Sequence, residues 1–67
     1  MNIRLLKAKM VEHDYTIDKL AKLLNLNPMT IRLKMKGDGF KVNEARAIMR
    51  ALKLNRTETC EIFFTDD

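Results

Sequence analysis

The chain has 67 residues, which predicts a single domain over residues 1–67, and it carries a formal net charge of +4, one cysteine and one histidine. A lone cysteine excludes an internal disulfide, no Cys/His cluster has the spacing of a metal site, and no apolar run is long enough for a signal peptide or a membrane span. We therefore expect a cytoplasmic protein that needs neither a metal nor a cofactor.

Helical periodicity runs through the chain, whereas strand patterns are nearly absent. Asn2 is a suitable N-cap for a first helix, which should end near residues 12–15. Its apolar stripe consists of Ile3, Leu6 and Met10. Thr16 is the next N-cap, and Asn25 is expected to end the second helix because Asn tolerates the left-handed conformation. The apolar positions of this second helix are Leu20, Ala21, Leu23 and Leu24.

The third helix is predicted over residues 28–36. Asn27 is a good N-cap, and Pro28 suits the first helical position because its missing N–H has no partner there. Gly37 is expected to end the helix. The sequence thus predicts a short helix that follows the second one after only three connecting residues.

A loop is predicted over residues 37–42, with Phe40 and Val42 turned inward. Asn43 is expected to cap the fourth helix. The apolar positions of that helix are Ala45, Ile48, Met49 and Leu52.

The fifth helix is predicted to begin after Asn55, which forms the pattern of a capping box with Glu58 three residues later. One of Phe63 and Phe64 should enter the core, and the other should stay exposed. Five short helices with brief connections predict an all-α fold, a compact five-helix bundle.

The third helix has two different sides when its residues are placed about 100° apart around the axis. Ile31 and Met35 share one side, which can face a core. The opposite side carries Met29, Leu33 and Lys36, with Arg32 at its flank. A helix in so small a bundle buries only one side, so we expect the mixed apolar and cationic side to point outward. Lys34 is expected on a solvated face.

Charge is distributed unevenly along the chain. Residues 57–67 contain four acids (Glu58, Glu61, Asp66 and Asp67) and no Lys or Arg, whereas residues 1–56 contain 13 bases against 5 acids, a net charge of +8. This cationic body suits a polyanionic partner, of which nucleic acid is the commonest, although a merely solvated basic surface would have the same composition.

Residues 16–37, TIDKLAKLLNLNPMTIRLKMKG, resemble the helix-turn-helix of the phage repressor/Cro (XRE-type) family, without a gap. The matching apolar positions are Leu20, Ala21, Leu24, Leu26 and Ile31. The flanking segments LKAKMVEHDYT and LKLNRTETCEIFF are similar to short, phage-associated members, so that the resemblance covers essentially the whole chain. Ile17 departs from the Gln of many relatives, Asn25 replaces the turn glycine, and Lys34 replaces an apolar residue, so Met35 must supply that packing.

The resemblance implies a lambda-repressor-like DNA-binding domain whose helix 28–36 enters the major groove. The implied base contacts are Asn27, Pro28, Met29, Arg32, Leu33 and Lys36. The implied phosphate contacts are Thr16, Lys19, Lys41 and Asn43, together with Lys36. Arg32 suits a bidentate contact to guanine, while Met29 and Leu33 suit thymine methyl groups.

The expected partner is double-stranded DNA, bound by a transcriptional regulator of phage or mobile-element type that competes with polymerase or another repressor. A homodimer on a two-fold operator is expected, with self-contact around the fifth helix. The alternative is a small modulator that binds a repressor or another protein through Pro28, Met29 and Leu33. An enzyme is not expected, because the chain has one histidine, one cysteine, no serine and scattered acids.

Overall fold

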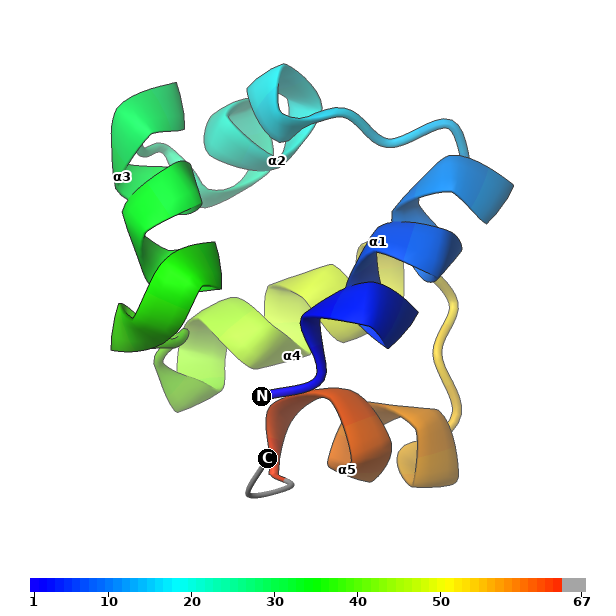
Figure 1. The fold of residues 1–67 in the computed structure, drawn as a ribbon. Helices are drawn as coiled ribbons and strands as arrows, with labels where there is room; N and C mark the ends of the chain where they lie inside the picture. Colours follow the sequence, from blue (N-terminus) through cyan, green and yellow to red (C-terminus); the bar gives the residue numbers. More distant parts are fainter. Residues whose placement is uncertain (65–67) are drawn as a thin grey trace.

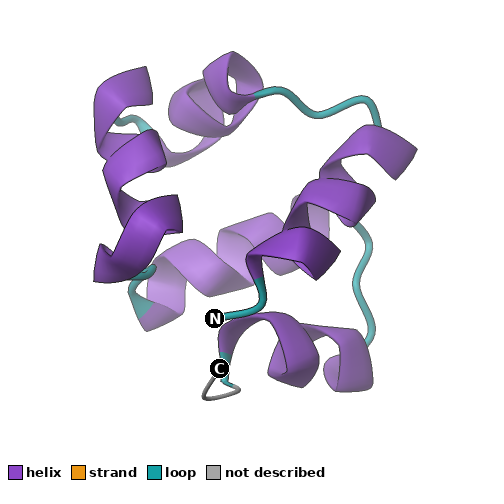
Figure 2. Ribbon diagram, viewed as in Figure 1, coloured by secondary structure: helices purple, strands orange, loops and turns teal. Residues whose placement is uncertain are grey.

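Five α-helices and one short π-helical turn make up residues 1–64, the part of the chain that this computed structural model describes (Figure 1). They are α1 (Ile3–Glu12), α2 (Ile17–Leu24), α3 (Pro28–Leu33), η1 (Lys34–Asp38), α4 (Val42–Ala51) and α5 (Arg56–Phe63). Within these residues there is no strand (Figure 2), so the predicted all-α class is confirmed. Residues 65–67, which include two of the four C-terminal acids, lie outside the described part.

Four of the predicted N-caps are confirmed by hydrogen bonds from side chain to backbone. In each, a side-chain oxygen accepts a bond from a backbone N–H in the first turn, a group that would otherwise lack a partner. The caps are Asn2 to Leu5 N at 3.1 Å, Thr16 to Lys19 N at 3.2 Å, Asn27 to Met29 N at 2.8 Å and Asn55 to Glu58 N at 2.7 Å. The capping box of α5 is complete, because Glu58 Oε1 accepts a bond from the N–H of Asn55 at 3.0 Å.

The predicted start of the fourth helix is wrong by two residues. Lys41 is the N-cap of α4, and Asn43 is the second residue of the helix. The reason is Glu44, whose Oε1 accepts a hydrogen bond from the N–H of Lys41 at 2.8 Å and so caps the helix from its third position. Val42, expected to turn inward, becomes the first helical residue and is 62% exposed.

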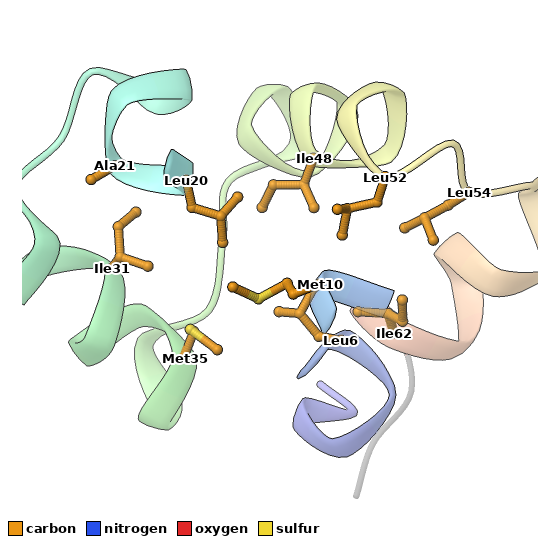
Figure 3. Close-up of a cluster of buried hydrophobic side chains, with 10 residues drawn as sticks. All are labelled: Leu6, Met10, Leu20, Ala21, Ile31, Met35, Ile48, Leu52, Leu54 and Ile62. Atoms are coloured by element: carbon orange, nitrogen blue, oxygen red, sulfur yellow. The ribbon is translucent and has the colours of Figure 1, made fainter. Parts of the chain in front are cut away.

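Every α-helix and η1 contribute side chains to one buried apolar cluster (Figure 3). Its members are Leu6, Met10, Leu20, Ala21, Ile31, Met35, Ile48, Leu52, Leu54 and Ile62. The predicted inward stripes of the helices are therefore confirmed in the main. Leu23 is an exception, because Leu20, Ala21 and Leu24 already fill the inner side of α2 and leave Leu23 exposed.

The first and last helices pack together and close the fold. The N–H of Asn2 donates to the carbonyl oxygen of Ile62 at 2.7 Å. Phe63 packs against the core and meets Phe40 edge to face, with ring centroids 6.1 Å apart and planes at 88°. Phe64 is 63% exposed, so the prediction that one phenylalanine enters the core and the other stays outside is confirmed.

Candidate nucleic-acid interface

A turn of three residues joins α2 to α3 and fixes the direction of α3. Asn25 ends α2 in the left-handed conformation, with φ 56° and ψ 46°, as its side chain predicted. The N–H of Leu26 then donates to the carbonyl oxygen of Ala21 at 2.8 Å, and the side chain of Asn27 caps the next helix. A dihedral preference or a hydrogen bond is thus present at each residue of the turn, and together they set the direction of α3 relative to α2.

The two sides of α3 and η1 differ as the sequence predicted. Ile31 is fully buried and Met35 is 7% exposed, so these residues anchor the helix in the core. Met29 is 59% exposed and Leu33 51%, although apolar side chains of this size are usually buried. Arg32 and Lys36 are also exposed. The outward side therefore presents two apolar and two cationic side chains.

The two residues at the start of α3 differ in how accessible they are. Asn27 is exposed, and its Oδ1 accepts the capping bond. Among residues 1–64 nothing accepts a hydrogen bond from its Nδ2, so that donor can serve a bound molecule. Pro28 is half-buried and borders a hollow together with Ala21 and Leu26. Pro28 is thus the least exposed of the six predicted base contacts.

The helical path ends two residues later than predicted. Gly37 was expected to end the third helix, but its φ is 179° and the chain continues in a π-helical turn through Asp38. Gly39 is the residue with positive φ, at 75°, and its N–H donates to the carbonyl oxygen of Lys34 at 2.9 Å. The left-handed region that favours glycine is therefore needed at Gly39 and not at Gly37.

Lys34 is not on a solvated face, which corrects the prediction. Its ammonium nitrogen lies 3.1 Å from Oε1 of Glu44, and both side chains are mostly covered. Partial burial alone would raise the pKa of Glu44, but the N–H of Lys41 and the ammonium of Lys34 outweigh it and lower the pKa. The same carboxylate oxygen thus ties the end of the exposed helix to the start of α4.

The predicted phosphate contacts lie at the starts of two helices. At α2, Thr16 Oγ1 accepts from the N–H of Lys19, whose Nζ in turn donates to a backbone carbonyl oxygen at 2.9 Å. At α4, Lys41 and Asn43 lie beside backbone N–H groups of the first turn, which have no partner inside the helix. All four side chains are exposed. Figure 1 shows α4 beginning next to the end of η1. Ile17, the first residue of α2, lines a hollow together with Arg32 and Lys36, so the start of each helix lies near the exposed helix.

Sequence reasoning missed Lys7, which the fold brings beside the exposed helix. A hollow of about 470 Å³ is lined by residues of α1, α2, α3 and η1. These residues are Ile3, Lys7, Ile17, Arg32, Met35 and Lys36. The exposed position of Lys7 on α1 was visible in the sequence pattern, but its proximity to Arg32 and Lys36 depends on how α1 packs.

No group of His, Cys, Asp and Glu side chains among residues 1–64 could hold a metal ion. In the same residues, no helix has the length and apolar character required to cross a membrane. Comparison of the chain with protein-family models, curated proteins and solved structures gave no match.

Proposed function

We propose that this protein binds double-stranded DNA and regulates transcription, with residues 28–36 of α3 and η1 placed in the major groove. The observation that carries the proposal is the outward side of this helix, where Met29 and Leu33 are more than half exposed beside Arg32 and Lys36. The major groove of B-DNA admits one α-helix and offers thymine methyl groups as well as hydrogen-bonding edges. A side that mixes apolar and cationic groups suits both.

The arrangement of α2 and α3 supports the same proposal. Two helices joined by a three-residue turn, with the second exposed along one side, resemble the helix-turn-helix of the repressor/Cro family. Ala21 is 3% exposed, and its small side chain leaves room for α3 to pack closely on α2. In this arrangement the second helix enters the groove and its N-terminal residues reach the base edges.

Each exposed side chain has a proposed role. Arg32 donates two hydrogen bonds to guanine, which is worth about 1–3 kcal/mol of discrimination, and Met29 and Leu33 contact thymine methyl groups or sugars. Nδ2 of Asn27 donates to DNA while Oδ1 keeps its capping bond. Lys36, Lys41 and the N-terminus of α4 near Asn43 hold phosphates at the end of the exposed helix, and Thr16 and Lys19 hold phosphates at the start of α2.

The regulator acts by occupying operator DNA and excluding polymerase or a competing repressor. One helix covers only a few base pairs, so two copies on half-sites about 34–36 Å apart read a two-fold operator. Self-contact between the copies comes from the surface around α5, where Phe64 is 63% exposed and Val42 is 62% exposed. We do not assign a catalytic role to any residue.

A second candidate function uses the same helix to bind a protein. Met29, Leu33 and the half-buried Pro28 form an apolar area that could dock on another repressor or on a polymerase subunit. Methionine adapts its shape to a partner more readily than other apolar side chains. The two candidates differ in their dependence on salt.

The deciding experiment is a titration of the protein with a labelled random-sequence duplex, measured by fluorescence anisotropy at increasing salt. DNA binding predicts that log affinity falls linearly with log salt, with a slope of about −0.9 for each phosphate neutralised. Lys36→Gln should make the slope shallower by about one unit. Arg56→Gln is the matched control, because Arg56 is exposed at the start of α5, away from α3. Absence of binding at low salt would refute the DNA proposal and leave the protein partner as the better candidate.

A further inference from the structure

The hollow beside α3 combines an apolar floor with a cationic rim. Ile3, Ile17 and Met35 are half-buried or buried, whereas Lys7, Arg32 and Lys36 are exposed. No acidic residue lines the hollow. Within residues 1–64 none of the three cations forms an ion pair; the lysines that do are Lys9 and Lys34, elsewhere on the surface.

We infer that this hollow binds an acidic, amphipathic polypeptide segment, which places an apolar side chain on the floor and carboxylates against the three cations. Three uncompensated cations around one hollow repel each other, and a ligand that brings carboxylates relieves this repulsion. Duplex phosphates pair with the cations of the rim but leave the apolar floor exposed to solvent. A segment that carries both carboxylates and apolar side chains pairs with the cations and also covers the floor.

The size and construction of the hollow are compatible with a segment of chain as the occupant. Its volume of about 470 Å³ is within the range of about 300–1,000 Å³ that ligand sites have. The floor is formed by side chains from three separate helical elements, so a helix or an extended segment can lie across it with one or two apolar residues inserted.

Occupation of the hollow would regulate the proposed function, and this part of the inference rests on that function. Arg32 and Lys36 belong both to the rim and to the proposed DNA contacts. A carboxylate that pairs with Arg32 accepts the guanidinium hydrogen bonds that would otherwise be donated to guanine. The acidic segment and the duplex therefore exclude each other, and the segment acts as an inhibitor of DNA binding.

The first test measures docking without DNA. The probe is a fluorescein-labelled synthetic peptide with leucines at helical spacing among glutamates. Two matched peptides carry either glutamines in place of the glutamates or serines in place of the leucines. We expect both replacements to weaken binding, and we expect amide NMR shifts induced by the acidic peptide to centre on Lys7, Ile17 and Lys36. Equal binding of the glutamine peptide, or shifts centred on the separate hollow that Phe64 lines, would overturn the inference.

Two variants of the protein sharpen this test. Lys7→Gln should weaken binding of the acidic peptide by about threefold to fivefold, the effect of an exposed ion pair. Arg56 is at the start of α5 and does not line the hollow, so Arg56→Gln removes a positive charge elsewhere and should change binding by less than twofold. Ile17→Gln removes apolar floor and should weaken binding by about tenfold. Thermal unfolding checks that each variant folds. Equal effects of Lys7→Gln and Arg56→Gln would indicate unspecific attraction and refute the site.

The second test adds the random duplex to the complex of protein and labelled peptide. Displacement of the peptide supports mutual exclusion, and a ternary complex of protein, peptide and duplex overturns it. If the protein binds no duplex at all, the proposed function and the regulation fail together, while the peptide titration still decides whether the hollow is a docking site.

Discussion

Glu44 connects the exposed helix to α4, and Glu44→Gln removes its charge while preserving its shape. In the structure one oxygen, Oε1, accepts from the N–H of Lys41 at 2.8 Å and lies 3.1 Å from Nζ of Lys34. A glutamine oxygen still accepts from that N–H, so the variant removes the charge and keeps the cap, and a double-mutant cycle with Lys34 isolates the ion pair. The two side chains are only 15% and 13% exposed. We therefore expect Glu44→Gln to lower the free energy of unfolding by about 1 kcal/mol, the upper end of the range for surface ion pairs.

The effect should depend on pH in a defined direction. The pKa of Glu44 in the folded protein is lower than its usual value, because the N–H of Lys41 and the ammonium of Lys34 outweigh the opposing effect of partial burial. A carboxylate with a lowered pKa stabilises the folded state above about pH 4.5, and this contribution is lost as the pH falls through the folded-state pKa. The difference in unfolding free energy between wild type and Glu44→Gln should therefore be largest at neutral pH and should disappear in acid.

Thermal and urea unfolding followed by circular dichroism measure this difference. At neutral pH the midpoint of Glu44→Gln should fall by about 4–8 °C, the shift that 1 kcal/mol causes in a domain of this size. Asp38→Asn is the control, because Asp38 is exposed and forms no ion pair within residues 1–64. A double-mutant cycle with Lys34→Gln should give a coupling of about 1 kcal/mol. Zero coupling, or a difference that persists unchanged at pH 3, would refute the role of the pair.

Four further outcomes are expected. Arg32→Ala should relax base preference at one operator position by about 1–3 kcal/mol without changing stability, measured by selection from random duplex libraries; an unchanged preference would contradict the guanine contact. Lys41→Ala should weaken binding to all sequences alike and reduce the salt slope by about one unit, whereas a sequence-dependent loss would contradict a phosphate role. Ile31→Ala, at a fully buried position, should lower the unfolding free energy by about 2–5 kcal/mol in urea titrations, and a loss below 1 kcal/mol would show that α3 is not anchored there. Gly39→Ala should cost about 1–3 kcal/mol in the same assay, because the φ of 75° strains an alanine; a neutral result would show that the backbone relaxes at this position.

Much of the fold could be predicted because its determinants are local. Asn2, Thr16, Asn27 and Asn55 each cap a helix through a hydrogen bond to a residue two or three positions later, so the sequence alone shows both partners. The outward side of α3 was predicted for a related reason. Spacing along a helix determines which residues share a side, and a bundle this small can bury only one of them.

The errors arise where two local signals compete, or where the deciding contact joins residues far apart in the chain. Gly37 was predicted to end the third helix because glycine commonly follows a helix, and Asn43 is a better N-cap by type than Lys41. Glu44 makes Lys41 the N-cap in place of Asn43, because its side chain caps α4 from within the helix. It also holds Lys34 near the end of the exposed helix, a contact between residues ten positions apart that no periodicity predicts.

The sequence by itself determined the number of helices, most of their N-caps and the side of α3 that faces outward, because these depend on neighbours within a turn or two. The tertiary structure decided that Lys34 pairs with Glu44 and is mostly covered, and that Lys7 of α1 lies beside Arg32 and Lys36 of the exposed helix. These features depend on how whole helices pack. Packing is set by the fit of side chains that are far apart in the chain, and that fit exists only once the core has formed.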